Sequence, residues 1–349
     1  MMDGSKQLPF VTAAAKARRP PGSSLEVSVA GGARVRLERA ACALCGAADD
    51  EPIVTVTDWR YALTEDLFTI VRCRRCRLAY LNPRPAPGDM RHFYPGRYYD
   101  RRRTRSGDPL SNREPPASPR VAPRVLAEQA ALCGGRPGRV LDVGCASGAF
   151  LARMRQSGWQ VQGVEVSAEA AAWGSAELEL DIVNRPLPEA GLPAASFDVV
   201  TYWSSLEHVH EPLAYLAETR RILKPEGRLI ALLPNFSSPT VRWLHWGLDP
   251  PRHLYHFTPA TLRRMLAKAG FTGQVAFRSR TGIEDGALHR QLRKIGRRME
   301  RSGRSHPRRP GLTVAGAAVE RLALLLAPAS WLLAVAGRNG AMIVIARAV

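Results

Sequence analysis

The stretch Val140–Phe150, VLDVGCASGAF, combines a buried strand, a Gly-rich turn and the start of a helix. Glycine at positions 144 and 148 lets the backbone pass close to a ligand. The helix N-terminus that follows can face a negative group such as a carboxylate. Taken alone, the pattern favours a plain strand-to-helix connection over a ligand site.

A second feature makes a ligand site the better interpretation. Glu165 ends the next apolar stretch, VQGVEVS, and comes 23 residues after Asp142. An acidic residue at about this distance can accept hydrogen bonds from both ribose hydroxyls of a nucleoside. The dinucleotide pattern GxGxxG is absent, since positions 144, 146 and 149 read Gly, Ala and Ala. A nicotinamide or flavin enzyme is therefore disfavoured.

Strands and helices alternate on both sides of this turn. This order predicts an α/β fold, with a doubly wound and mostly parallel sheet covered by helices on both faces. The expected strands are 139–143, 161–166, 197–202, 229–233, 273–277 and 341–345, and the expected helices are 125–132, 150–156, 168–176, 213–223 and one starting near Pro259.

About 100 residues, in the same order, resemble the class I methyltransferases that use S-adenosylmethionine. The similar segments are LDVGCASG, Glu165, SFDVVTYWSSLEHVHEP from Ser196 and RILKPEGRLIALLPN from Arg221. The resemblance implies a seven-stranded Rossmann-like sheet.

It also implies the positions that hold the cofactor. Asp142, Gly144 and Gly148, with Cys145 and Ala146 between them, would surround its methionine part, and Glu165 would hold the ribose. Backbone near Tyr202 and Trp203 would line the methyl-transfer site, and Val166 would lie beside the nucleoside. The sequence departs from the family at Ala146, where glycine is commoner and where a methyl group is tolerable if φ is negative. It departs again near the adenine, where only Asn184 offers a polar contact.

Four of the six cysteines form two CxxC pairs, Cys42 with Cys45 and Cys73 with Cys76. Each pair can place two thiolates on one tetrahedral Zn²⁺, and four such ligands make a structural site. Two redox pairs and four free thiols are the alternatives. Short β-like runs at 53–56, 68–71 and 78–81 predict a small zinc ribbon.

After the second pair comes LAYLNPRPAPGDMRHFYPGRYYD. With the ribbon, this continuation resembles a methyltransferase subgroup often found in glycan and natural-product pathways. Tyr94, Tyr98 and Tyr99 could close over the cofactor or acceptor, or pack between the two domains.

Two histidines lie in segments that the resemblance places at the cofactor mouth. His208 stands in SLEHVHEP, and His253 stands in WGLDPPRHLYHFT. Methyl transfer needs an aligned acceptor whose proton is removed, and neutral imidazole is available near pH 7. We expect His253 to act as base or acceptor ligand, whereas His208 serves equally well as a base or as a packing and capping residue.

The remaining segments define the expected domain organisation. We expect a mobile arm at 1–35, the ribbon and Tyr-rich connector at 36–99, a basic Pro-rich linker at 100–124, and the methyltransferase domain at 125–349 with a helical insertion at about 281–338. Residues 322–337 are apolar and follow a basic stretch, but they contain Pro328 and fall short of the ~20 residues that cross a bilayer. They could pack internally, dimerise or touch an anionic membrane.

Composition bounds the function classes. The absence of a signal-peptide core and the paired cysteines favour a cytoplasmic protein. The net charge of +19, nearly all from arginine, suits either a polyanion partner or a coding bias. The leading hypothesis is a methyltransferase for a small molecule or lipid-linked glycan. The alternatives are a ribosomal or transfer RNA methyltransferase, disfavoured because the ribbon lacks a clear aromatic platform, and a non-catalytic adaptor, disfavoured because the cofactor residues are intact.

Overall fold

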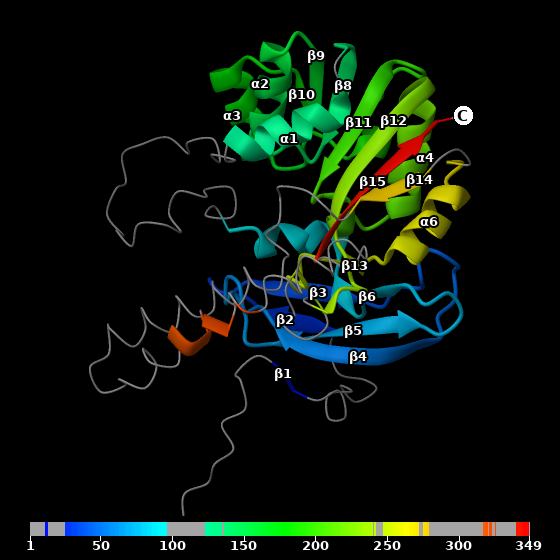
Figure 1. Ribbon diagram of the computed structural model, residues 1–349. Helices are drawn as coiled ribbons and strands as arrows, with labels where there is room; N and C mark the ends of the chain where they lie inside the picture. Colours follow the sequence, from blue (N-terminus) through cyan, green and yellow to red (C-terminus); the bar gives the residue numbers. More distant parts are fainter. Residues whose placement is uncertain are drawn as a thin grey trace, which may run out of the picture.

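The chain folds into an α/β domain that stands on a β-rich module (Figure 1). The computed structural model describes residues 11–12, 25–95, 123–134, 136–239, 241, 247–271, 275–278, 317–319, 321–322, 325 and 340–348. Residues 100–122 of the predicted linker and most of the predicted C-terminal insertion lie outside the described residues, as do Tyr98 and Tyr99, whereas residues 123–124 belong to a helix.

The α/β domain is built on a seven-stranded sheet in the order β10-β9-β8-β11-β12-β15-β14. The first five strands of this order are parallel, and β15 runs antiparallel between β12 and β14. Their bounds are β8 Arg139–Val143, β9 Gln160–Val164, β10 Ile182–Val183, β11 Phe197–Trp203, β12 Leu223–Pro234, β14 Val275–Arg278 and β15 Ala341–Arg347. The predicted fold class is confirmed.

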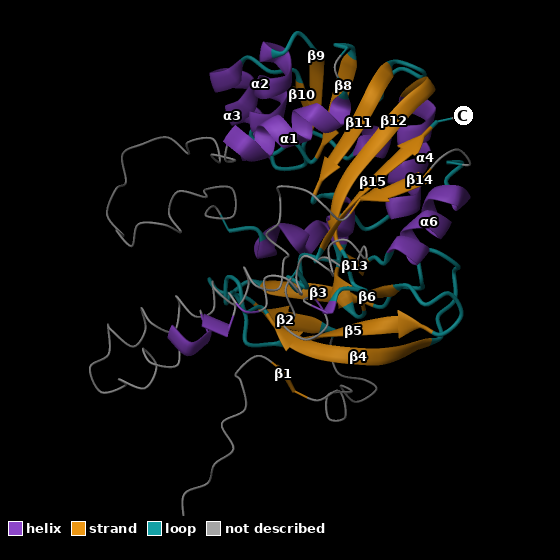
Figure 2. Cartoon of the chain, viewed as in Figure 1, coloured by secondary structure: helices purple, strands orange, loops and turns teal. Residues whose placement is uncertain are grey.

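Helices cover both faces of this sheet (Figure 2). Side chains alternate across each strand, so Val140 packs in the cluster with α1 and α2, whereas Leu141 packs in the cluster with α4 and α6. The helices are α1 Pro123–Cys133, α2 Ala149–Gln156, α3 Ala168–Leu178, α4 Pro212–Ile222 and α6 Pro259–Lys268, with 3₁₀ turns η1 Pro87–Phe93, η3 Leu187–Glu189 and η4 Leu206–His208.

The ends of the predicted helices follow local sequence signals. Ser167 caps α3 by accepting from the Ala170 amide, and Thr258 forms a reciprocal capping box with Thr261 at α6. Pro212 and Pro259 occupy first helical positions, where no amide hydrogen is needed.

The N-terminal module contains an antiparallel sheet in the order β1-β4-β5-β6-β13 and a three-stranded sheet in the order β2-β3-β7. Its strands are β1 Val11–Thr12, β2 Glu26–Ser28, β3 Arg34–Glu38, β4 Asp50–Thr57, β5 Leu67–Cys73, β6 Ala79–Leu81, β7 Arg84–Pro85 and β13 Tyr255–His256. The predicted arm ended at residue 35, but Glu26–Ser28 pairs with Arg34–Arg36. That boundary is therefore too late: alternating burial at Val27 and Val35 anchors this hairpin in the core.

One strand of the N-terminal sheet is supplied from the other end of the chain. Tyr255 and His256 of β13 pair with Tyr80 and Ala79 of β6. The segment that follows His253 thus completes the ribbon's sheet. One hydrophobic cluster runs from the ribbon through Leu254 and Phe257 to α6. The carboxyl end of β11 points toward this module in Figure 1.

Candidate functional site

The Gly-rich turn follows β8 at the sheet edge that faces the ribbon. Gly144 and Gly148 have φ of +73° and +82°, the left-handed region in which side chains are strained. A Cβ on Gly148 would lie 2.2 Å from Leu180 Cδ1. Gly148 also offers no side-chain cap to α2, so the first-turn amides of α2 suit an external carboxylate.

Ala146 does not meet the condition set from the sequence. Its φ is +49°, not negative. The strain of a non-glycine residue there is offset by its amide, which donates to Glu165 Oε2 over 2.8 Å. A side-chain acceptor 19 residues away therefore holds a conformation that local sequence does not favour.

Glu165 lies directly after β9, where the resemblance places the ribose ligand. Its carboxylate accepts from the amides of Ala146 and Ser167, both over 2.8 Å. Burial raises the pKa of Glu165, and these backbone donors oppose the rise. Two bonds leave acceptor capacity on the carboxylate. Val166, the next residue, is 64% exposed and thus available to a flat ring.

Asn184 stands at the end of β10, beside this carboxylate. Its Nδ2 donates to the Glu165 carbonyl over 2.8 Å. Asn184 therefore helps to hold the backbone at Glu165, and the contacts of Glu165 with ribose and of Asn184 with adenine stay predictions.

Asp142 is buried at the end of β8. Its Oδ1 accepts from the Thr201 hydroxyl over 2.8 Å. Burial raises the pKa of Asp142 to about 7, with Glu165 adding to the rise. Cys145 is also buried, and its Sγ lies where a Cβ on Gly163 would be 2.6 Å away. Both side chains support the turn from beneath.

Tyr202 and Trp203 are the last two residues of β11, and their side chains point in different directions. The Tyr202 hydroxyl lies 2.6 Å from Thr219 Oγ1 in the core, so only its backbone can line a site. The Trp203 ring packs edge-on against Phe150, with ring centroids 5.3 Å apart. Its indole nitrogen is buried with no hydrogen-bond partner among the described residues.

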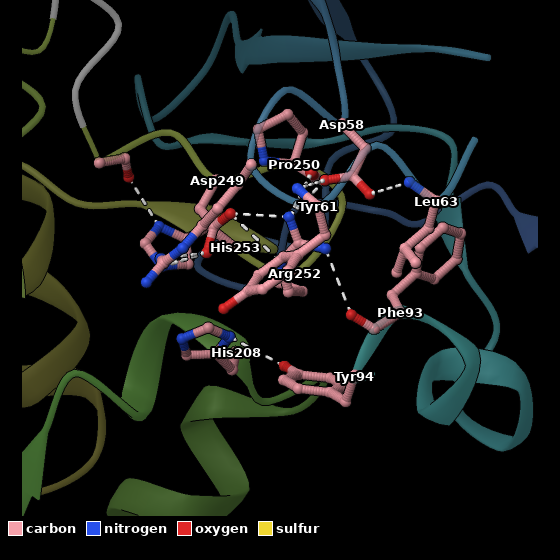
Figure 3. Close-up of polar contacts among 12 residues, drawn as sticks. Asp58, Tyr61, Leu63, Phe93, Tyr94, His208, Asp249, Pro250, Arg252 and His253 are labelled. Atoms are coloured by element: carbon pink, nitrogen blue, oxygen red, sulfur yellow. Dashed lines mark hydrogen bonds and ion pairs between the residues drawn. The ribbon is translucent and has the colours of Figure 1, made fainter. Parts of the chain in front are cut away.

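The two predicted histidines meet beyond β11 (Figure 3). Their rings pack edge-on with centroids 4.6 Å apart. His208 Nδ1 lies 2.9 Å from the Tyr94 hydroxyl. His253 Nδ1 lies 2.6 Å from the Gly247 carbonyl, which can only accept, so this nitrogen carries the proton and Nε2 keeps its lone pair. Burial lowers the pKa of His208 to about 4 and that of His253 well below its usual value.

Glu207 joins this cluster, although no sequence motif predicted it as a site residue. The carboxylate of Glu207 is 1% exposed and has no hydrogen-bond partner among the described residues. Its Oε1 lies 4.0 Å from His253 Nε2. Burial raises the pKa of Glu207 to about 8, and Asp249 adds to the rise. Its position beside His208 was the only sequence signal.

A buried ion-pair network holds the His253 segment against the ribbon (Figure 3). Arg252 is fully buried and contacts Asp58 over 2.5 Å and Asp249 over 2.8 Å. It also donates to the Phe93 carbonyl and lies over the Tyr61 ring. Asp249 in turn accepts from Arg60. No local sequence pattern predicts this role for Arg252, because Asp58 and Phe93 lie far away in the sequence.

The four paired cysteines converge in the ribbon. All four Sγ atoms lie within 4.8 Å of one another. The Cys42–Cys76 and Cys45–Cys73 separations are 3.3 and 3.5 Å. Four thiolates on a tetrahedral Zn²⁺ lie about 3.8 Å apart, given Zn–S bonds of ~2.3 Å. The donor set and its spacing therefore fit zinc.

Comparison with known proteins agrees with this geometry. Residues 114–274 match the sequence model of a family described as a methyltransferase domain. Together with the sheet order described above, this match supports a Rossmann-like α/β domain similar to methyltransferase domains.

Individual relatives match over parts of the chain. The ubiquinone biosynthesis O-methyltransferase of Psychrobacter arcticus is 31% identical over 153 residues, which are 39% of this chain and 60% of that protein. The enzyme of the same description from Cronobacter sakazakii is 33% identical over 117 residues, 32% of this chain and 48% of that protein. The chain thus spans about half to 60% of these relatives.

Among solved structures, phosphoethanolamine N-methyltransferase 2 of Haemonchus contortus, in complex with S-adenosylhomocysteine, has a TM-score of 0.48 at 17% identity. That match covers 76% of this chain and 62% of the other.

One finding concerns whether a helix of this chain could cross a membrane. Among the described residues, no helix has the length and apolar character needed to cross a membrane. The apolar segment 322–337 lies almost wholly outside those residues.

Proposed function

We propose that the chain is an S-adenosylmethionine-dependent methyltransferase for a small-molecule acceptor. The observation that carries this is the pairing of the strained Gly-rich turn with Glu165 at the carboxyl edge of a seven-stranded sheet. Ligands of open α/β sheets bind at this edge. The uncapped start of α2 would face the cofactor's carboxylate, Glu165 its ribose and Val166 its base.

When bound, S-adenosylmethionine supplies a methyl group already activated by its sulfonium. The protein's task is then to align the acceptor and receive its proton. His253 is suited to this because its Nε2 lone pair is fixed by the Nδ1 bond to Gly247. Asp249 Oδ2 lies 3.9 Å from that Nε2 and would stabilise the imidazolium that forms.

His208 and Tyr94 complete the same wall. The Tyr94 hydroxyl and the His208 ring fix each other, and the His208 ring lies against the His253 ring. We assign His208 and Tyr94 a positioning role, and His253 the catalytic one. The resemblance to enzymes of glycan and natural-product pathways supports a hydroxyl, amine or carbon acceptor on a small molecule.

We propose further that Cys42, Cys45, Cys73 and Cys76 hold a structural Zn²⁺. Arg264 donates to the Cys76 carbonyl over 3.0 Å and Lys268 to the Leu44 carbonyl over 2.9 Å. Helix α6 is thus hydrogen-bonded to both cysteine turns. The metal would hold the ribbon in the shape that receives β13.

Calorimetry with the pure, zinc-loaded chain tests the activity. We expect S-adenosylmethionine and S-adenosylhomocysteine each to bind at one site per chain. A transfer screen with radiolabelled methyl donor would then identify the acceptor. If neither nucleoside binds to the folded protein, the proposed function is wrong and a binding adaptor is favoured.

A further inference from the structure

A cavity of about 730 Å³ lies between the ribbon and the methyltransferase domain, outside the histidine cluster. Strands β4 and β5 and the second cysteine turn form one side, and the start of α6 with the chain after β12 forms the other. Ile53, Phe236 and Leu248 give it apolar walls. This volume is in the range of small-molecule sites, which combine apolar walls with a few convergent polar groups.

The charged side chains that line this cavity, within the described part of the chain, are all cationic. Arg72, Arg77 and Arg264 line it, and none of its lining residues in the described part of the chain is acidic. Glu51 is a shared partner, 3.2 Å from Arg77 and 3.9 Å from Arg72. Three guanidinium groups, with no acidic side chain among the described lining residues, give the cavity wall itself a net positive charge. The positive end of α6, at Ala260, adds to it.

The cavity adjoins the proposed base. Leu248 immediately precedes Asp249, whose carboxylate lies beside His253. Phe236, on another wall, packs on His256 with ring centroids 5.5 Å apart. A molecule seated here would therefore lie against the loop that carries His253.

We propose that this cavity binds an anionic group, a phosphate or a carboxylate, carried on an apolar part of the acceptor. Guanidinium groups match both anions in a planar, bidentate geometry. The proposal rests on the proposed methyltransferase function and names the class of acceptor. Binding at this remote group would orient the reacting atom toward His253.

The test uses the full, zinc-loaded chain and three fluorescent probes of one shape: 1-naphthyl phosphate, 1-naphthoate and neutral 1-naphthol. We expect at least one anion to bind about tenfold or more tightly than naphthol, with affinity falling as salt rises. The tighter anion identifies the head group. Equal binding of all three probes would overturn the proposal.

Variants locate the site. Arg264→Gln should weaken anion binding about tenfold, whereas Arg263→Gln, one position along α6 and outside the cavity lining, should leave it unchanged. Because Arg264 also bonds to Cys76, a second variant is needed. Ala260→Trp fills the cavity with no change of charge and should abolish anion binding.

S-adenosylmethionine binding, measured on the same variants, separates the two proposals. If cofactor binding is retained and the anion affinity is equal in wild type and Ala260→Trp, the proposed anion site is wrong while the proposed methyltransferase function stands. Lost cofactor binding in the folded wild type would refute the methyltransferase function, whatever the probes do.

Discussion

At the scale of single residues, the candidate site contains polar and titratable side chains whose burial is energetically unfavourable. Glu165 is both the ribose ligand of the proposal and the acceptor that holds Ala146 at φ +49°. Glu207 is buried with no hydrogen-bond partner among the described residues, and His253 is neutral in the same cluster. Such perturbed groups gather at functional sites.

Replacing Glu165 by Gln should weaken S-adenosylmethionine binding about 10- to 100-fold, because hydrogen bonds to a charged acceptor are worth ~1.5–3 kcal/mol. Calorimetry measures the change. Glu169→Gln, exposed in the first turn of α3, is the matched control and should bind normally. Unaltered affinity in Glu165→Gln would remove the ribose assignment.

Replacing His253 by Gln should lower kcat by roughly 10²–10⁴ with the acceptor identified by the transfer screen, because proton acceptance is lost. The cofactor's Kd should stay the same. His208→Gln should have a smaller effect on kcat, since His208 acts through its contact with the His253 ring. Equal losses in both variants would argue against His253 as the sole base.

The pKa of Glu207 gives a prediction about stability. With a folded-state pKa of about 8 against an ordinary 4.5, folding retains a proton that the unfolded chain releases. The contribution of Glu207 to the free energy of unfolding of the wild type therefore falls as pH rises from 4.5 to 8. Glu207→Gln does not titrate, so its stability relative to wild type should increase between pH 5 and 9, by a few kcal/mol at most, since one pKa unit is ~1.4 kcal/mol. Urea unfolding of both proteins across this range measures it, and a constant difference would contradict it.

At the scale of elements, β13 and the loop before it have two attachments. The Leu254 amide donates to the Glu207 carbonyl and the Leu81 amide donates to the Leu254 carbonyl, so one residue links η4 to β6. Arg252 adds the ion pairs to Asp58 and Asp249. The segment that presents His253 is thus a strand and turn held by both domains.

Arg252→Met should destabilise the fold by roughly 3–5 kcal/mol, because it leaves two buried carboxylates without their shared cation. Thermal or urea unfolding gives the value. Arg60→Gln is the control: Arg60 is 47% exposed, so its loss should cost under about 1 kcal/mol. Similar costs for the two variants would show that burial of Arg252 does not set the strength of the network.

At the scale of the whole molecule, the ribbon and the α/β domain share one hydrophobic cluster and one β-sheet. The Gly-rich turn is held by residues of its own sheet, whereas the loop that carries His253 is held by contacts with the ribbon. In the proposed reaction, cofactor binding and proton acceptance would therefore depend on different parts of the molecule.

Removal of zinc should affect methyl transfer and cofactor binding differently. Chelation, or Cys76→Ser, should release the ribbon and reduce methyl transfer at least about tenfold, while S-adenosylmethionine affinity changes little. Metal content, cofactor calorimetry and transfer rate are measured on one sample, and added Zn²⁺ should restore the rate. Parallel loss of cofactor binding would mean that the ribbon supports the whole domain.

The local features of this protein were determined by the sequence alone. The strand–turn–helix at Val140–Phe150, the acidic residue after β9 and the spacing of the cysteines each depend on residues close together, where periodicity and turn chemistry act. The alternating strands and helices then allowed few sheets other than the one observed.

Other features were decided only by tertiary structure. Arg252 and Asp58 are 194 residues apart, β13 pairs with a strand of another domain, and Ala146 owes its φ to Glu165. The burial of Glu207 and the arginine-lined cavity likewise arise where the two domains pack. Such contacts follow from how preformed elements dock, because the free energy of burying a charge or completing a sheet exists only once both partners are in place.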